Sequence, residues 1–584
     1  MCSIYDKVAL MKKIITRKVP ENVPLLHQHP LLNRIYAARG VTSASELDYD
    51  LTRLLPYNSL KGIQLAVECL VQALQEQQRV LIVGDFDADG ATSTALAVLT
   101  LKSLGLKNIS YLIPSRFDFG YGLTPEIVAV AAKQQPQLII TVDNGITSVD
   151  GVKAANALGI KVLVTDHHLP GDELPEAGAI VNPNQYGDQF LSKHLAGVGV
   201  IFYLMVAVRS HLRDIGWFDS QNIPAPNLAQ FLDLVALGTV ADVVNLDHNN
   251  RVLVAQGLQR IRSGKCRMSI KALLAITKRN FENTLASDLG FVIAPRINAV
   301  GRLDDMSIGV ECLLTEDVEY ARSIAKQLDA LNNERRGIEE DMRHQAARIL
   351  DDLQLQQDLP SGLCIFEETW HQGVLGILAS RLKDKLHRPV IAFTAISETE
   401  IRGSARSIGS VHMRNVLNKI SVQNPGLITR FGGHAMAAGL SLGRESYEMF
   451  AQVFATEVEQ HMVLADLDGY AYADGGLPAE YFNIATAELL RDSGPWGEGF
   501  PEPAFFNEFI LVTQRLVGQK HLKLTLRPLE ADQEIDAICF NINPNIWPNF
   551  RFAKAKIVYR LGVNEYMGRR SLQLMVDELI PCSH

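Results

Sequence analysis

The chain has 584 residues, with 56 Lys and Arg against 65 Asp and Glu, so its formal net charge is −9. This length corresponds to about three to five domains. A content of 47% hydrophobic and 21% charged residues excludes disordered, collagen-like and coiled-coil proteins. The negative charge argues against a protein that coats nucleic acid indiscriminately, although it allows a local basic channel.

The cysteines and the apolar segments indicate where the protein resides. Seven cysteines are scattered singly without a CxxC pair, which excludes a thiolate zinc site or a disulfide framework and favours a reducing compartment. The longest apolar run, Leu195–Val208, has 14 residues, whereas a bilayer span needs roughly 20. No targeting segment stands out at the N-terminus. We therefore expect a soluble, cytoplasmic protein that makes no membrane contact.

Between residues 79 and 182, short apolar segments rich in β-branched residues alternate with helical ones. This alternation predicts a parallel sheet covered on both faces. The expected helices are Ala91–Leu104, Pro125–Lys133 and Val149–Leu158. The expected strands are Arg79–Val83, Ile109–Ile113, Leu138–Val142, Lys161–Val164 and Ala179–Val181.

Three further regions follow a mostly helical stretch over residues 192–275. Near-heptad apolar spacing from Val318 to Leu355 predicts a long helix joining two lobes. A coiled-coil dimer is the alternative, but Arg335 and Gln345 interrupt its seam. A second strand–helix–strand unit is expected from Gly362 to about residue 439, and a small β-barrel from about 500 to 584.

Three carboxylates crowd the turn after the first strand: Asp85, Asp87 and Asp89. Like charges this close repel each other and usually need cations. The pattern matches the start of an EF-hand loop, but Leu96 occupies the place of its last ligand and a strand precedes it. A solvated loop that caps the next helix remains the alternative.

Acidic and imidazole side chains also follow two later strands. Asp143 follows Leu138–Val142, and Asp166, His167 and His168 follow Lys161–Val164. Because the carboxyl ends of parallel strands border one crevice, we expect these groups to converge. Carboxylates with one or two imidazoles favour Mn²⁺ or Mg²⁺ over structural zinc. A site of this size suits two ions about 3.5–4 Å apart, as in phosphoryl hydrolysis.

These motifs resemble the DHH phosphoesterase superfamily. The resemblance rests on Gly84–Ser93, Thr141–Gly145, Asp166–His168 and Leu232–Val244. We expect Asp143 to be the best candidate for bridging two metals, and we interpret Asp233 as structural because it lies on the same expected helix as Asp242 but more than two turns earlier. The implied metal ligands are Asp85, Asp87, Asp89, Asp143, His167 and Asp242.

Within this superfamily, the chain resembles the RecJ exonucleases over essentially its whole length. The pyrophosphatase pattern has His where this chain has Val83, which counts against that subfamily. The motifs that resemble RecJ are Ser115–Leu123, Pro295–Arg302 and, in the second lobe, Trp370–Gly376, Gly403–Ser407 and Phe431–Gly439.

The resemblance implies roles for individual residues, although a surface ion pair could explain each arginine separately. The implied catalytic residues are Asp143, His167, His168, Arg296, Asn298 and Arg302. The implied substrate-binding residues of the two lobes are Arg116, Arg296, Asn298, Arg302, Ser404, Arg406, Ser407, Gly432, Gly433 and His434.

A basic stretch with aromatic residues lies near the C-terminus. Arg551–Arg570 holds six Lys and Arg against the single acid Glu565. Such a stripe on a barrel is typical of single-strand binding, with charge along the backbone and rings against bases. We expect Arg551 and Arg560 to contact the strand. The alternative is that the interleaved aromatic rings belong to the barrel core.

The expected fold class is α/β: a parallel-sheet DHH domain joined by a long helix to a smaller α/β DHHA1 domain, with a C-terminal OB-like barrel. The expected boundaries are an N-terminal segment 1–55, a catalytic domain 56–315, a connecting helix 316–356, a DHHA1 domain 357–465 and an OB-like domain 466–584.

The expected function is hydrolysis of single-stranded DNA to mononucleotides by an exonuclease with two Mn²⁺ or Mg²⁺ ions. The resemblance implies 5′→3′ polarity, a role in DNA repair and recombination, and a helicase and a single-strand-binding protein as partners. Two alternatives remain at this point: a phosphatase acting on pyrophosphate or short oligonucleotides, and a catalytically inactive single-strand-binding protein.

Overall fold

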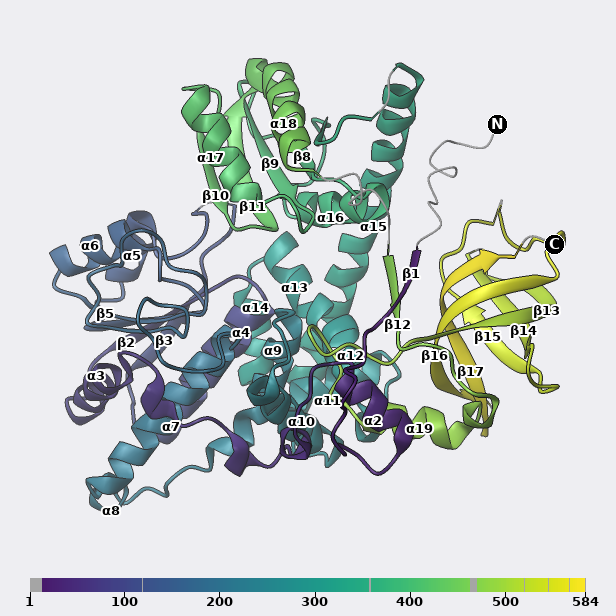
Figure 1. Cartoon of the computed structure of the whole chain (residues 1–584). Coiled ribbons are helices and arrows are strands. Elements are labelled where there is room, and N and C mark those ends of the chain that lie inside the picture. The colour runs from purple at the N-terminus through teal and green to yellow at the C-terminus, as the bar shows by residue number, and fades with distance from the viewer. Residues whose placement is uncertain are drawn as a thin grey trace.

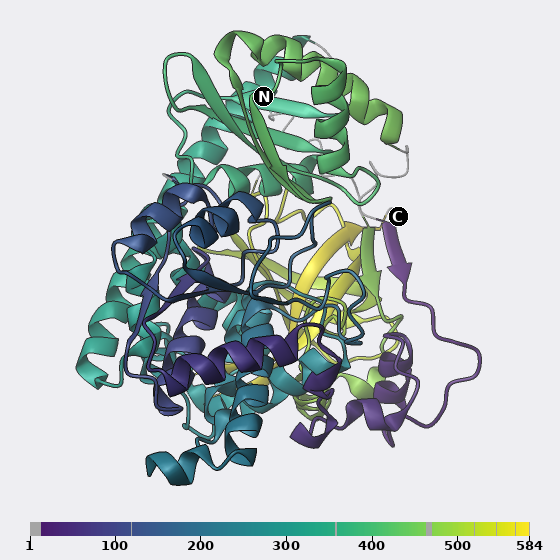
Figure 2. The same ribbon diagram turned by 90° about the vertical axis from the view of Figure 1, so that its left-hand side faces the viewer.

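A computed structural model describes residues 13–117, 119–356, 359–462, 470–518, 520–544, 546–566 and 568–582. The expected boundary between 465 and 466 and the start of the N-terminal segment lie outside the described residues. Figure 1 shows three bodies: an α/β domain at the left, a second lobe above it and a barrel at the right. Figure 2, turned by 90°, again shows the second lobe above the first domain.

The first domain is built on a five-stranded sheet with the order β3-β2-β4-β5-β6, in which every described pairing is parallel. Alternate residues of one strand face opposite ways: Val80 and Ile82 pack with α3, α4 and α7, whereas Leu81 and Val83 pack with α5 and α6. Burial on both faces explains why the strands are apolar throughout. The strands are β2 (Val80–Gly84), β3 (Ile109–Leu112), β4 (Leu138–Val142), β5 (Lys161–Thr165) and β6 (Ala179–Val181).

Helices surround this sheet and extend the domain toward the middle of the molecule. Those beside the sheet are α3 (Ile63–Gln75), α4 (Ala88–Ser103), α5 (Pro125–Ala132), α6 (Val149–Ala157) and α7 (Gly197–Asp214). The others are α2 (Pro30–Ala37), α8 (Trp217–Gln221), α9 (Leu232–Ala241), α10 (His248–Arg262), α11 (Met268–Ile276), α12 (Ala286–Asp288), the π-helical segment η6 (Leu289–Ile293), α13 (Ala294–Leu303) and α14 (Ser307–Leu314).

The predicted connecting helix is α15 (Val318–Gln356), which packs on α11 and α13 and on α16 of the second lobe. The two polar residues that interrupt its heptad spacing have hydrogen-bond partners within the chain. Arg335 donates hydrogen bonds to Glu339 and Asn332, and Gln345 accepts one from the Trp370 indole at 2.7 Å.

The second lobe contains a mixed sheet with the order β10-β11-β9-β8-β7. Helix α16 covers one face, and α17 and α18 lie on the side of a separate apolar cluster. The strands are β7 (Leu363–Phe366), β8 (Val390–Ala395), β9 (Glu400–Arg406), β10 (Arg430–Gly433) and β11 (Ala437–Gly443), and the helices are α16 (Leu375–Leu386), α17 (Met413–Gln423) and α18 (Tyr447–His461).

The C-terminal body is a closed barrel with the order β13-β14-β15-β17-β16. The β15–β17 pairing is parallel and the others are antiparallel, which is the connectivity of an OB-fold. Its elements are α19 (Ile484–Asp492), β13 (Phe505–Val517), β14 (His521–Pro528), β15 (Ile535–Cys539), β16 (Lys554–Tyr566) and β17 (Arg569–Pro581).

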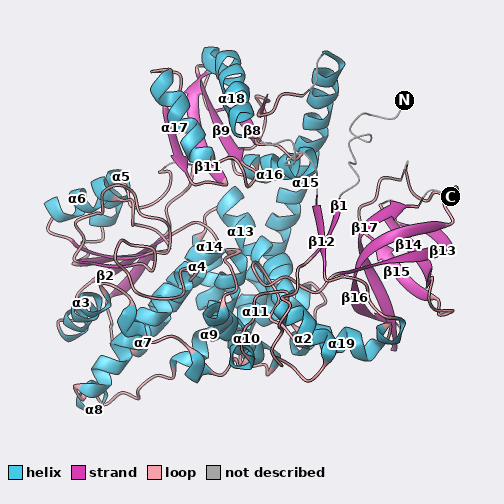
Figure 3. Cartoon of the chain, viewed as in Figure 1, coloured by secondary structure: helices cyan, strands magenta, loops and turns pink. Residues whose placement is uncertain are grey.

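A short parallel ribbon links the N-terminal segment to the strand that precedes the barrel: β1 (Lys13–Thr16) pairs with β12 (Tyr470–Ala473). Figure 3 shows this ribbon between the helices and the barrel. The predicted fold class is confirmed. In the part of the chain that the structure describes, no helix is long and apolar enough to cross a membrane.

Candidate metal centre and substrate cleft

The carboxyl ends of β2 and β4 deliver acidic side chains to one place. Asp85 follows β2 and is buried, and Asp143 follows β4 and is 2% exposed. Asp87 is the N-cap of α4, where its carboxylate accepts a hydrogen bond from the backbone N–H of Gly90 at 3.0 Å. The strand–turn–helix geometry therefore accounts for the crowding of the first motif.

Asp89 is held from the opposite side by the start of α7. Its carboxylate accepts hydrogen bonds from the backbone N–H groups of Gly197 at 2.6 Å and Val198 at 3.0 Å. These are unpaired donors of a helix N-terminus, which favour an anionic partner. Asp89 is thus oriented by a helix more than 100 residues away in the sequence.

Asp143 lies in a left-handed conformation, with φ of +62°. This conformation is uncommon outside glycine, although Asp tolerates it better than most residues. Gly197 approaches closely: a Cβ atom there would lie 2.6 Å from the Cβ of Asp143. Only glycine at this position lets α7 begin against the Asp143 side chain.

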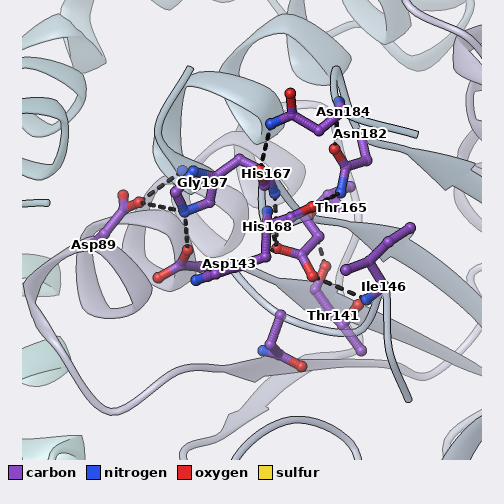
Figure 4. A network of polar contacts seen from close by, with 12 residues as sticks. Asp89, Thr141, Asp143, Ile146, Thr165, His167, His168, Asn182, Asn184 and Gly197 are labelled. Atoms are coloured by element: carbon purple, nitrogen blue, oxygen red, sulfur yellow. Dashed lines mark hydrogen bonds and ion pairs between the residues drawn. The ribbon is translucent and has the colours of Figure 1, made fainter. Parts of the chain in front are cut away.

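His167 is the hub of the cluster (Figure 4). Its Nε2 atom lies 3.1 Å from Asp143 Oδ1, 3.5 Å from Asp242 Oδ2 and 4.0 Å from Asp89 Oδ2. Asn184 donates a hydrogen bond to the backbone carbonyl of His167 at 2.6 Å, which fixes the loop. Asp242, at the end of α9, thereby joins the residues that follow the strands.

The cluster has the properties that a pair of divalent cations requires. Nε2 of His167 and Oδ1 of Asp143 are both buried without a hydrogen-bond partner. Burial and the neighbouring carboxylates raise the pKa of Asp143, and burial lowers the pKa of His167 to about 3, which leaves its lone pair available. Three overlapping groups have ligand atoms within 4.8 Å: Asp143 with His167 and His168, Asp89 with His167 and Asp242, and Asp85 with Asp87 and Asp143.

Asp166 orients this cluster instead of ligating in it. Its Oδ1 accepts hydrogen bonds from the backbone N–H groups of His167 and His168 and from Nδ1 of His168 at 2.7 Å. Burial opposes ionisation of Asp166, but His168 holds its pKa at about 2. Burial likewise opposes the charge on His168, but Asp166 raises the His168 pKa to about 9. His168 is therefore a cation at neutral pH.

Two rings border His168, one from the second lobe and one from the first domain. The His434 ring of the second lobe stacks on the His168 ring, with centroids 5.9 Å apart. The Tyr121 hydroxyl lies 3.0 Å from His168 Nδ1 and donates to the backbone carbonyl of Asp143 at 3.2 Å. Sequence reasoning did not single out Tyr121, although it lies within the Ser115–Leu123 motif.

Three arginines gather beside the metal ligands with few counter-charges. Arg116 lies over the Phe86 ring at 4.2 Å, and its Nε is buried without a partner. Burial and then the nearby Arg116 and Arg406 lower the pKa of Arg302 to about 9. Burial and Arg116 also lower the pKa of Arg406. Buried cations that repel one another favour the approach of an anion.

Arg296 and Asn298, both expected to contact phosphate, have polar partners within the chain. The Arg296 guanidinium pairs with Asp329 of α15 at 2.8 Å and donates to the carbonyl of Val292 at 2.6 Å. Asn298 accepts a hydrogen bond from the backbone N–H of Ala88 at 2.8 Å. These contacts anchor α13 to its neighbours.

The expected substrate residues of the second lobe lie on β9 and β10 or directly after them. Ser404 lies 3.3 Å from the Arg406 guanidinium, and Gly432 is exposed with open space around it. Gly433 has φ of +141° and precedes His434. Ser407 instead is 1% exposed and donates to the carbonyl of Val411 at 2.6 Å, so its hydroxyl stabilises the local turn.

Part of the basic stripe on the barrel is neutralised by ion pairs within the chain. Arg551 is exposed in the loop before β16, whereas Arg560 pairs with Asp577 at 2.9 Å and Glu502 at 2.7 Å. Tyr559 is fully buried inside the barrel. For this ring, the alternative of a core position is correct, since its place on β16 faces inward.

Comparison with protein families matches three parts of the chain. The DHH family N-terminal domain matches residues 79–239, the DHHA1 domain matches 360–460, and the RecJ OB domain matches 473–578. The single-stranded-DNA-specific exonuclease RecJ of Salmonella typhimurium strain LT2 is 52% identical over 97% of both chains. This chain belongs to the RecJ family.

Other members of the RecJ family agree with this assignment. RecJ of Escherichia coli K12 is 51% identical over 97% of both chains. The crystal structure of RecJ from Thermus thermophilus in complex with Mn²⁺ superposes with a TM-score of 0.78 at 27% identity, covering 98% of this chain and 80% of that one. The superposition extends over the DHH domain, the connecting helix, the DHHA1 lobe and the barrel together.

Membership of the RecJ family decides between the functional classes left open by the residues. An exonuclease specific for single-stranded DNA is favoured over a pyrophosphate or short-oligonucleotide phosphatase and over an inactive binding protein. The ligand cluster, the arginine cluster and the barrel are the three features of this chain that such an activity needs.

Proposed function

We propose that this chain removes mononucleotides from the 5′ end of single-stranded DNA with two Mn²⁺ or Mg²⁺ ions. The observation that carries the proposal is that His167 Nε2 and Asp143 Oδ1, 3.1 Å apart, are both buried without a hydrogen-bond partner. They belong to two neighbouring sets of potential ligands, one with Asp89 and Asp242 and the other with Asp85 and Asp87. When bound, such cations supply Lewis acidity that polarises the phosphodiester and make water nucleophilic at neutral pH. The residues proposed to hold them are Asp85, Asp87, Asp89, Asp143, His167 and Asp242.

In this proposal, His168 stabilises charge on the scissile phosphate. Asp166 accepts the Nδ1–H of His168 and keeps the ring protonated, so that Nε2–H remains to donate to a phosphate oxygen. His434 stacks on the same ring from the second lobe. A preformed cation beside the ligands stabilises the transition state without reorganisation.

Arg116, Arg302 and Arg406 bind phosphate in the proposal, with Ser404, Gly432 and Gly433 beside them. Their mutual repulsion is relieved when an anion enters, and a terminal phosphate carries more charge than an internal diester. The 5′→3′ polarity of the proposal rests on membership of the RecJ family, because a terminal phosphate at either end would carry the same charge. Arg551 and Arg569 remain exposed on the barrel and are proposed to guide the strand.

The proposal also includes the partners and the location of the protein in the cell. Single-stranded DNA of this kind arises in repair and recombination, so a helicase and a single-strand-binding protein are proposed as partners. A cytoplasmic location is proposed as well, because the six described cysteines are all unpaired, as a reducing compartment requires.

Digestion of single strands labelled at one end tests the proposal. With Mn²⁺, the wild-type protein is expected to release a 5′ label as a mononucleotide before a 3′ label. His167→Ala is expected to abolish release of either label, whereas Asp150→Asn, an exposed acid in the first turn of α6, retains it. Faster turnover of pyrophosphate than of a long strand would favour the phosphatase instead.

A further inference from the structure

A cavity of about 390 Å³ lies between the helices of the first domain and the barrel. Its walls come from the end of α9, from η6, from the segment after α19 and from β16 of the barrel. Its volume is within the range of small-molecule sites. None of the ligands or phosphate-binding residues described above lines it, except for Arg560 of the barrel.

Two exposed apolar side chains border this cavity, and both belong to residues with an unusual backbone conformation. Val243 is 64% exposed and has φ of +58°, a conformation that is strained for a β-branched residue. Phe291 is 79% exposed and lies in the π-helical segment η6. Pro295 lacks the N–H that an α-helix would donate to the carbonyl of Phe291, which explains the local change of helix.

The charged residues that line the cavity are equal in number for the two signs. Three arginines line it together with three carboxylates, and two of the arginines have their guanidinium groups paired: Arg491 with Asp492, and Arg560 with Glu502. A phosphate would find no free cation in either pair. A neutral planar group with an apolar face and a polar edge suits an apolar floor and a balanced rim.

The cavity also lies between the two ends of the expected strand path. Val243 directly follows Asp242, whose Oδ2 is 3.5 Å from His167 Nε2. On the other side, Arg560 belongs to β16 of the OB-fold barrel. The lining of the cavity therefore includes both the neighbour of a proposed metal ligand and a strand of the barrel.

We propose that this cavity binds one unstacked nucleobase of the single strand, with the Phe291 ring against the base and Val243 beneath it. This inference rests on the proposed function, because it assigns a second contact of the same substrate. Stacking on a ring is tolerant of sequence, since every base has a flat π-face. The neutral rim presents no fixed donor pattern that would select one base.

Fluorescence of 2-aminopurine tests the proposal in the full-length protein. The base analogue is placed at each of the first several positions from the 5′ end, and EDTA prevents hydrolysis. We expect strong quenching at one internal position, loss of most of that quenching in Phe291→Ala, and its retention in Phe291→Tyr. Tyr186→Ala removes a ring that is 59% exposed elsewhere and is the matched control.

Steady-state kinetics give a second readout that does not depend on binding in EDTA. Phe291→Ala is expected to raise KM about 5- to 100-fold for a strand long enough to reach the barrel. Turnover of a dinucleotide, which is too short to occupy the cavity, stays at the wild-type rate. The thermal unfolding midpoint also stays unchanged, because the Phe291 ring is exposed.

Each outcome separates this proposal from the proposed function. Quenching that persists in Phe291→Ala, together with an unchanged KM for the long strand, would overturn the nucleobase site and leave the cavity to an apolar side chain of a partner protein. Equal losses on the dinucleotide and the long strand would overturn it too. Absence of wild-type hydrolysis on both substrates would instead contradict the proposed nuclease.

Discussion

Asn298 on α13 accepts a hydrogen bond from the backbone N–H of Ala88 at 2.8 Å, which ties α13 to the first turn of α4. That turn carries Asp87 and Asp89, so a helix that contributes no metal ligand helps to position two of them. A Cβ atom at Gly301, one turn further along α13, would lie 2.0 Å from the carbonyl oxygen of Phe86. The contact therefore depends on close approach of the two backbones.

Asn298→Ala is expected to weaken Mn²⁺ binding about 10- to 100-fold, because groups that orient ligands contribute on this scale. Isothermal titration calorimetry measures the affinity directly. Asn280→Ala is the control: it removes an exposed side chain that accepts a hydrogen bond from the backbone N–H of Glu282, and it is expected to leave the Mn²⁺ affinity unchanged. Wild-type affinity in Asn298→Ala would show that α4 begins in the same place without the hydrogen bond.

Asp143→Asn is expected to change the stability of the metal-free and metal-bound protein in opposite directions. The metal-free variant should unfold at a higher temperature, because one member of a buried set of like charges becomes neutral. Mn²⁺ at 100 times its dissociation constant stabilises a site by about 2.7 kcal/mol, and the variant should lose this gain. Thermal unfolding in EDTA and in Mn²⁺ measures both effects.

Gly197→Ala is expected to destabilise the first domain by about 1–3 kcal/mol, because its new Cβ would overlap the Asp143 side chain. Gly337→Ala is the matched control, since it lies within α15 with open space around it. That change should stabilise the protein by about 0.5–1 kcal/mol through helix propensity. Denaturant unfolding of both variants measures the difference, and equal effects would contradict the close approach.

Arg406→Gln is expected to weaken binding of a 5′-phosphorylated strand about 10- to 100-fold, the scale of a hydrogen bond to a charged group. A strand with a 5′-hydroxyl should lose less, because it lacks the anion that relieves repulsion among the arginines. Arg402→Gln is the control, because Arg402 lies on the same strand as Arg406 but its guanidinium donates a hydrogen bond to Gln372. KM for the two strands measures the preference.

Acid is expected to loosen the second lobe through Glu457. Burial opposes ionisation of Glu457, but hydrogen bonds from Lys419 at 2.7 Å and His461 at 2.9 Å lower its pKa in the folded state. A depressed folded pKa contributes stability above the unfolded value, and this stability is lost as the pH falls through the folded value. The protection factors for hydrogen exchange in α17 and α18, corrected for the intrinsic rate at each pH, should therefore fall below about pH 4.5, and Glu457→Gln should remove that dependence.

The sequence by itself determined the parallel sheet and the place where its polar groups meet. Strand periodicity and β-branched residues are local properties, and the carboxyl ends of parallel strands share one edge whatever surrounds them. The strand pattern alone therefore placed Asp85, Asp143 and His167 together. The resemblance of Leu232–Val244 to a superfamily motif added Asp242, which lies about 75 residues after His167.

Only the tertiary structure decided what the helical and barrel residues contact. Arg296 pairs with Asp329 on α15, although its motif predicts a phosphate contact. Tyr559 is buried in the barrel, although its segment predicts contact with single-stranded DNA. Phe291 reaches the cavity because Pro295 changes the local helix. The direction of a side chain depends on which distant elements pack beside it, and that choice is made by burial over the whole chain and not by local spacing.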